Sequence, residues 1–250
     1  MTRFQKLLII AVLLSVAALV AGKPALGLIV LAAMLVAIGL GVTFPQLSLF
    51  GPYICRGDAS RRRVALTFDD GPDNRSTPAL LDLLKAENIE AAFFCVGQRV
   101  AAAPEVANRI VSEGHLLENH SFGHSNLTNF FSLDRLKSEL ERTQTAIHAA
   151  TGSTPHFFRP PMGLSNPRTF RAAHALGLRV IGWSSRGLDT ITPSAEKVVT
   201  RILRRVQPGA IILLHDGNIP AERLVLTVKL LLNRLREREY EIVRLDRMLK

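Results

Sequence analysis

The sequence is short of acidic residues, of aromatic residues and of cysteine. Its 31 lysines and arginines face only 21 aspartates and glutamates, so the formal net charge is +10. Such a balance suits an anionic membrane surface, an acidic or phosphorylated substrate, or nucleic acid. Aromatic residues make up only 6% of the chain, and no zinc-finger, RNP or helix-turn-helix signature is present. We therefore expect no nucleic-acid partner.

The cysteines are too few to form a disulfide framework, and the chain shows no low-complexity segment. Cys95 lies in the apolar run AAFFCVG, which predicts a buried free thiol. Whether it pairs with Cys55 does not follow from the sequence. Cysteine usage therefore indicates no cellular compartment.

Charge is missing altogether from two stretches near the N-terminus. Leu7 to Gly22 and Pro24 to Phe44 are separated only by Lys23. Ten Leu, Ile or Val residues in the first stretch, at about −0.4 kcal/mol each, favour membrane insertion by roughly 4 kcal/mol. We predict a transmembrane helical hairpin over residues 1–46. A cleaved signal peptide is disfavoured by the second uncharged run, and a soluble helical hairpin by the lack of a polar face.

The charges that flank this hairpin bear on its orientation. Arg3 and Lys6 precede it, Arg56 and Arg61 to Arg63 follow it, and Lys23 stands alone in the turn. The positive-inside rule then places both ends, and the domain that follows, on the cytoplasmic face of a bacterial-type inner membrane. The rule is weaker before a large domain, and a single span would place that domain outside.

Residues 47–62, which contain Gly51, Pro52 and Gly57, are the predicted linker to a single catalytic domain over residues 63–250. In that domain short apolar runs alternate with amphipathic stretches. The predicted strands are Val64–Phe68, Glu90–Val96, His115–Glu118, His156–Phe158, Leu178–Trp183, Ala210–Leu214 and Glu241–Arg244. The predicted helices are Pro78–Glu87, Val100–Ser112, Leu133–Ala150, Pro167–Leu176, Ala195–Val206 and Ala221–Glu237. Alternation of this kind predicts an α/β fold with about seven parallel strands, in a barrel or an open sheet.

The stretch VALTFDDGP, Val64 to Pro72, predicts a buried strand that delivers Asp69 and Asp70 to its carboxyl end. Adjacent carboxylates repel each other unless a cation or a proton separates them. One solution gives one acid to a metal while the other works as a base. The alternative is a turn in which both acids only cap the next helix.

His120 and His124, four residues apart, follow the third predicted strand. With one carboxylate they could hold zinc or another divalent first-row ion and leave a position open for water. Arg159, Asp189 and His215 also stand just past predicted strands. Each alone could be structural, as a surface ion pair, a turn residue or a core-edge histidine. Because the carboxyl ends of parallel strands share one face, we expect all these side chains to meet there.

Five short segments resemble, in order, the motifs of a known family. They are TFDDGP at 67–72, HSFGH at 120–124, RPPMG at 159–163, WSSRGLD at 183–189 and LLH at 213–215. They are similar to the motifs of polysaccharide deacetylases of the NodB-homology type, carbohydrate esterase family 4. The resemblance implies a distorted (β/α) barrel with fewer than eight strands. It also implies metal-dependent removal of N-acetyl groups from amino sugars of chitin-like polymers, peptidoglycan or related glycans.

Residue by residue, the resemblance implies a role for each matched position. One divalent metal, with Zn²⁺ expected and Co²⁺, Ni²⁺ or Mn²⁺ as alternatives, would be held by Asp70, His120 and His124. Asp69 would be the general base, oriented by Arg159, and His215 the general acid, tuned by Asp189. The backbone N–H of Met162 would stabilise the oxyanion, and Trp183 and Leu213 would line the substrate site.

Three positions depart from the family pattern. Met162 and Thr190 stand where aromatic residues are common, and Arg186 takes the place of an acid. Together with the hairpin and the basic charge, this motivates the hypothesis that the substrate is an anionic or lipid-linked amino sugar at a membrane, with membrane lipid as a second partner. Two alternatives stay open: a membrane-tethered glycan-binding or scaffolding protein without turnover, and a deformylase or other amidase acting on a lipid-linked sugar.

Overall fold

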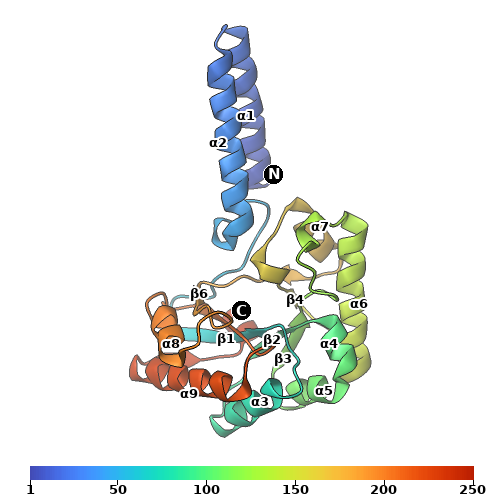
Figure 1. The fold of residues 1–250 in the computed structure, drawn as a ribbon, viewed down its shortest axis with the longest axis vertical. Coiled ribbons are helices and arrows are strands. Elements are labelled where there is room, and N and C mark those ends of the chain that lie inside the picture. Colours follow the sequence, from blue (N-terminus) through green and yellow to red (C-terminus); the bar gives the residue numbers. More distant parts are fainter.

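The computed structural model describes residues 1–250 and shows a long helical hairpin standing on an α/β domain (Figure 1). The hairpin consists of α1 (Arg3–Val20) and α2 (Pro24–Thr43). Its apolar side chains are exposed, for example Leu13 at 63% and Leu35 at 70%. By length and composition both helices could cross a membrane, a property that a signal sequence shares.

The base of the hairpin is attached to the domain by the residues that follow α2. The ring of Phe4 packs on that of Phe50, with centroids 5.2 Å apart, and Phe4 donates its backbone N–H to the Leu49 carbonyl. The short helix η1 (Pro45–Leu47) comes next, and Gln46 donates from its side chain to the carbonyl of Trp183. The hairpin thus starts beside the wall of the domain.

The domain is built on one twisted sheet in which every strand pair is parallel, which confirms the predicted distorted (β/α) barrel. The strands are β1 (Arg63–Asp69), β2 (Ala92–Cys95), β3 (Leu116–Asn119), β4 (Phe157–Phe158), β5 (Arg179–Val180), β6 (Ser185–Arg186), β7 (Ala210–His215) and β8 (Glu241–Ile242). Seven of them follow one path, β5-β4-β3-β2-β1-β7-β6, and β8 pairs with the start of β1. The sequence did not predict β6, whose residues were expected to lie in a loop.

Part of the predicted linker crosses the gap between β5 and β7. Ile54 bridges Ile181, just past β5, and Arg56 bridges Ala210 at the start of β7. Tyr53, which precedes Ile54 in the chain, is buried, and its hydroxyl donates to the Gly163 carbonyl. These contacts complete the wall of the barrel on the side that carries the hairpin.

Helices cover the outside of the sheet (Figure 1). They are α3 (Ser76–Ala86), α4 (Gly97–Ala102), α5 (Pro104–Ser112), α6 (Leu133–Thr151), α7 (Pro167–Ala175), α8 (Ala195–Leu203), α9 (Ala221–Glu237) and α10 (Leu245–Met248), with the short η2 (Thr128–Phe130) and η3 (Pro161–Gly163). The single helix predicted over Val100–Ser112 is wrong, because the chain breaks at Ala103 (φ −135°), before Pro104. A residue before proline is driven out of the helical region by the proline ring.

The central strand β1 sets the position of the site. Val64, Leu66 and Phe68 point into the main core between sheet and helices. Successive side chains alternate across a strand, so Thr67 and Asp69 face the other way, into the barrel. β1 lies between β2 and β7, and Asp69 is in register with His215 of β7. The proposed base and acid are therefore neighbours across one strand pair.

Candidate active site

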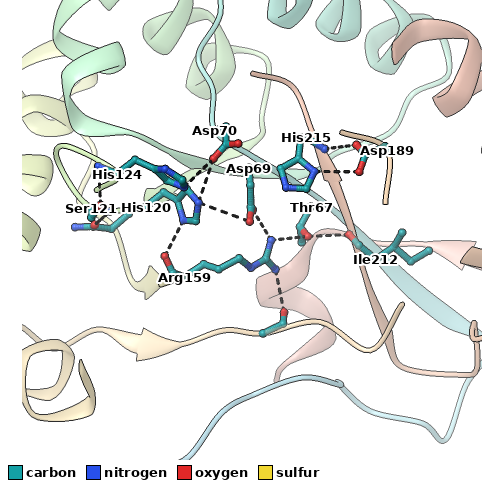
Figure 2. Close-up of polar contacts among 12 residues, drawn as sticks. Thr67, Asp69, Asp70, His120, Ser121, His124, Arg159, Asp189, Ile212 and His215 are labelled. Atoms are coloured by element: carbon teal, nitrogen blue, oxygen red, sulfur yellow. Dashed lines mark hydrogen bonds and ion pairs between the residues drawn. The ribbon is translucent and has the colours of Figure 1, made fainter. Parts of the chain in front are cut away.

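The candidate site is a cavity of about 290 Å³ at the carboxyl ends of the strands. Nine of the ten residues that the sequence indicated line it: Asp69, Asp70, His120, His124, Met162, Trp183, Asp189, Leu213 and His215. Arg159 lies behind Asp69 and does not reach the cavity wall. Figure 2 shows the two histidines and Asp70 together, with His215 and Asp189 on the other side of Asp69.

Arg159 is fully buried and fixes Asp69 in place. Its guanidinium donates to Asp69 Oδ1 at 2.5 Å, to Thr67 Oγ1 at 2.9 Å and to the Gly182 carbonyl at 2.9 Å. It also lies over the ring of Phe94, 4.1 Å from the centroid. Buried charges are tolerated when they are paired and hydrogen-bonded, so this arrangement leaves Asp69 little freedom to rotate.

Asp70, His120 and His124 form a set of donors that fits a divalent metal. Asp70 Oδ1 lies 3.1 Å from His124 Nε2 and 3.4 Å from His120 Nε2, and one ligand atom of each residue lies within 4.8 Å of the others. His120 Nδ1 is 2.7 Å from the Arg159 carbonyl, which can only accept, so Nδ1 carries the proton. Nε2 of His120 is then free to bind a metal, and such outer hydrogen bonds commonly orient metal-binding histidines.

Two of these three residues adopt a left-handed backbone. Asp70 has φ 71° and His124 has φ 45°. Such conformations cost non-glycine residues energy and cluster at functional sites. Burial raises the pKa of Asp70, but the hydrogen bonds and charges of His120 and His124 outweigh it and hold that pKa well below its usual range.

His215 is held by both oxygens of one buried carboxylate. Its Nδ1 lies 3.0 Å from Asp189 Oδ1, and its backbone N–H donates to Asp189 Oδ2 at 2.8 Å. Burial lowers the pKa of His215, but the hydrogen bond and charge of Asp189, with the charges of Asp69 and Asp70, raise it to about 9. At neutral pH the imidazole is therefore protonated and can donate a proton from Nε2.

A turn and a tryptophan form the remaining wall. Met162 in η3 has φ 56° and a side chain that is 48% exposed, and Gly163 follows it at φ 69°. A Cβ on Gly163 would lie 2.2 Å from the Trp183 ring, so only glycine allows this approach. Arg186 also lines the cavity, with its guanidinium 5.5 Å from the Trp183 ring.

The sequence reasoning missed several contributors. Thr67 lies two residues before Asp69, and the period of a strand could have placed it on the same face. The carbonyl of Gly182 leaves no signal, because any residue supplies one. Leu188 lines the cavity, and Asp216, fully buried beside the β1 end, accepts from Thr77 Oγ1 at 2.5 Å. Asp216 directly follows His215, but nothing in the sequence marked it as buried.

Comparisons with known proteins agree with these motifs. The model of the polysaccharide deacetylase family matches residues 56–181. A peptidoglycan-N-acetylglucosamine deacetylase of Bacillus cereus is 34% identical over 164 residues, which are 66% of this chain and 59% of that protein. A chitooligosaccharide deacetylase of a Bradyrhizobium species is 35% identical over 167 residues, 66% of this chain and 76% of that protein. The chain thus spans about three-fifths of the first relative's length.

Solved structures also match the domain. An acetyl xylan esterase of family 4 from Clostridium thermocellum, in complex with a cobalt ion, superposes with a TM-score of 0.68 and 36% identity, over 74% of this chain and 89% of that one. A family 4 pseudoenzyme from Bacillus anthracis superposes with a TM-score of 0.74 and 27% identity, over 80% of this chain and 69% of that one. With half of its length matched by the family model and about a third of the aligned residues shared with named members, the chain belongs to the polysaccharide deacetylase family.

Proposed function

We propose that the protein is a metal-dependent hydrolase that removes N-acetyl groups from amino sugars of a glycan. The observation that carries this proposal is that three sets of functional side chains meet at one small cavity. These are a metal-fitting triad, an aspartate fixed by a buried arginine and a histidine whose pKa is raised to about 9. A metal-dependent hydrolase can cleave an amide with such a set, in which the metal site activates water, a base takes its proton and an acid protonates the leaving amine.

Asp69 is the general base of the proposed reaction. A divalent ion bound by Asp70, His120 and His124 would polarise the amide carbonyl and make water more acidic. Asp69 lies beside that triad, with Oδ2 3.8 Å from His120 Nε2. Arg159 holds its other oxygen, so Oδ2 is free to take the proton as water attacks the acetyl carbon.

His215 is the general acid. An amine leaves only when it is protonated, and His215 carries the proton that it needs. Nδ1 is engaged by Asp189, so Nε2 is the nitrogen that gives its proton to the leaving nitrogen. The backbone N–H of Met162, in the turn across the cavity, is the proposed donor to the oxyanion. The products are acetate and a free amino sugar.

Two alternatives to an N-deacetylase differ from it in the product that they release. A glycan-binding protein without turnover has a precedent in the matched family 4 pseudoenzyme. The presence here of the base, the acid and all three metal ligands favours turnover. A deformylase would use the same residues on a different acyl group. Identification of the released acid as acetate or formate distinguishes a deacetylase from a deformylase.

We further propose that the hairpin anchors the enzyme in a bacterial inner membrane and that the substrate is an anionic or lipid-linked amino sugar. The two uncharged helices support the anchor. Arg186 supports the anionic substrate, because it faces the catalytic cavity and has no carboxylate partner. A soluble chitooligosaccharide that is turned over as fast as a lipid-linked amino sugar would contradict this part of the proposal.

The proposal is tested by release of acetate from a panel of N-acetylated glycans and lipid-linked sugars, using full-length protein in lipid. We expect activity that requires metal and falls at least about 10²-fold in Asp69→Asn. Bound metal should persist in this variant, because Asp69 is not one of the three ligands. Asp134→Asn, which neutralises an exposed carboxylate on α6, is the matched control. Full metal occupancy without release of any acid would show a binding protein instead.

A further inference from the structure

A second cavity, larger than the catalytic one, lies between the hairpin and the domain. Its volume is about 850 Å³, against about 290 Å³ for the catalytic site. One side is formed by the first turn of α1 and by residues 50–54, and the other by α6, α7 and β5. Figure 1 shows α7 at the end of the domain that carries the hairpin, with α6 beside it and running away from the hairpin.

The floor of this cavity is apolar. Phe4 comes from the hairpin, Phe50 from the segment after α2, and Phe170 and Leu178 from the domain. Phe50 and Leu178 are buried, whereas Phe4 and Phe170 are half-buried and still face open space. A concave apolar surface of this volume is suited to a flexible hydrocarbon chain.

The rim of the cavity is basic. Lys137 of α6, Arg171 and His174 of α7, and Arg179 of β5 line it, and none of its lining residues is acidic. Lys137, Arg171 and Arg179 have no carboxylate partner, whereas seven other arginines in the chain have one. Three unpaired cations around an apolar floor match a negatively charged head group that is joined to a hydrocarbon chain.

The cavity lies at the level where the hairpin would enter a membrane. α1 begins at Arg3, and its first turn lines the cavity, as do residues 50–54, which follow α2 and η1. We propose that it binds one anionic phospholipid, with an acyl chain on the phenylalanine floor and the phosphate among Lys137, Arg171 and Arg179. This inference rests on the membrane anchor proposed above, and not on the deacetylation chemistry.

The test uses full-length protein in nanodiscs of phosphatidylcholine with a minor fraction of phosphatidylglycerol. The phosphatidylglycerol carries a photoreactive group on its acyl chain, and the labelled peptides are identified by mass spectrometry. The test variant is Lys137→Gln/Arg171→Gln/Arg179→Gln. The matched control, Arg204→Gln/Arg205→Gln/Lys229→Gln, removes the same charge from exposed positions that do not line the cavity.

We expect label on the peptides that contain Phe170 and Leu178. It should fall by roughly fivefold for each cation removed in the test variant and stay unchanged in the control. Equal labelling by photoreactive phosphatidylcholine would overturn recognition of an anionic head group. An unlabelled cavity in protein that enters nanodiscs and releases acetate would overturn the lipid site alone. Protein that fails to enter nanodiscs would overturn both the anchor and the lipid site, while acetate release still tests the chemistry.

Discussion

At the scale of single residues, the pKa of His215 sets the pH range of the proposed reaction. The group must be protonated to act as an acid, and its pKa of about 9 keeps it so at neutral pH. In Asp189→Asn the carboxylate is lost while burial still lowers the pKa of His215. We expect the alkaline limb of kcat to move to lower pH, by at least about one unit.

The measurement is the pH profile of acetate release at saturating substrate. Asp134→Asn provides a variant with the same change of charge on the exposed face of α6. An alkaline limb that does not move in Asp189→Asn would show that another group is the acid.

Arg159 should contribute to stability as well as to catalysis. Arg159→Met would leave Asp69 buried without its partner, at a cost of about 3–5 kcal/mol. Thermal unfolding of the metal-free protein measures this cost. In the double variant Arg159→Met/Asp69→Asn we expect part of the stability to return, because the unpaired charge is gone. Equal losses in the single and the double variant would mean that the arginine acts through packing alone.

Side chains at this scale were predictable where the chemistry needs particular residue types. The structure brings together the side chains of Asp69, Asp70, His120, His124, Arg159, Asp189 and His215, all of which stand at or beyond the carboxyl ends of strands. The sequence did not predict the hydrogen-bond partners and buried groups that surround these side chains. The Gly182 carbonyl that accepts from Arg159 belongs to no residue type in particular, and the burial of Asp216 depends on how the loop between β1 and α3 closes.

At the scale of elements, Asp216 fastens that loop to the end of β7. It accepts from Thr77 at the start of α3, and a Cβ on Gly71 would lie 2.2 Å from its carboxylate. Burial, together with the negative charges of Asp70 and Asp69, raises the pKa of Asp216 to about 7. The hydrogen bond from Thr77 acts in the opposite direction but is outweighed. A carboxyl whose pKa is raised on folding binds its proton more tightly in the folded state. Its contribution to stability is therefore lost as the pH rises from about 4 to about 7.

We accordingly expect Asp216→Asn to be less sensitive to pH than the parent protein. Each pH unit between the unfolded and folded pKa values corresponds to roughly 1.4 kcal/mol. The measurement is the unfolding free energy of metal-free protein between pH 4 and pH 8. Glu118 and His215, whose pKa values are also raised, give slopes of the same sign in both proteins, so the difference between variants isolates Asp216. Identical slopes in the two proteins would contradict the expectation.

The turn η3 should be sensitive to any side chain at Gly163. Gly163→Ala would combine a left-handed backbone with a clash against Trp183, the only tryptophan in the chain. We expect a red-shifted tryptophan emission, because the ring must move out of its buried position, together with reduced acetate release. Gly152→Ala is the matched control, since Gly152 also has a positive φ of 70° but has no neighbour within 4 Å. Emission that is unchanged in Gly163→Ala would mean that the turn, and not the tryptophan, gives way.

Long periodic elements were predictable, and the predicted strands also covered the two-residue strands β4, β5 and β8, but not β6. The apolar run of β1 and the amphipathic pattern of α6 are recognisable in the sequence, because burial of one face imposes a regular spacing of apolar residues. The two-residue strand β6 has no room for a period, and its pairing with β7 is a product of tertiary structure. The break at Ala103 was predictable from Pro104, but the amphipathic pattern on both sides obscured it.

At the scale of the whole molecule, the segment between the hairpin and β1 touches both cavities. Ile54 lines the larger one, while Tyr53 packs on Phe170 there and donates to Gly163 at the catalytic wall. The catalytic cavity is therefore held at a fixed place relative to the hairpin base. With the hairpin in a membrane, as proposed, we expect the enzyme to favour substrates presented at the membrane surface over polymers far from it.

For the proposed membrane anchor, the side of the membrane that carries the domain decides which substrate is available. Arg3, Lys6 and the arginines after the hairpin favour the cytoplasmic face. On that face the amino sugars held at the membrane would be lipid-linked precursors. On the outer face the substrate would be finished cell-wall polymer. With the domain on the cytoplasmic face, a membrane-impermeant maleimide should label exposed Ser60→Cys only after bacterial cells are opened. Ala21→Cys, at the other end of the hairpin, should be labelled in intact cells. The reverse pattern would place the domain outside, and identical behaviour of both cysteines would mean that the hairpin does not cross the membrane.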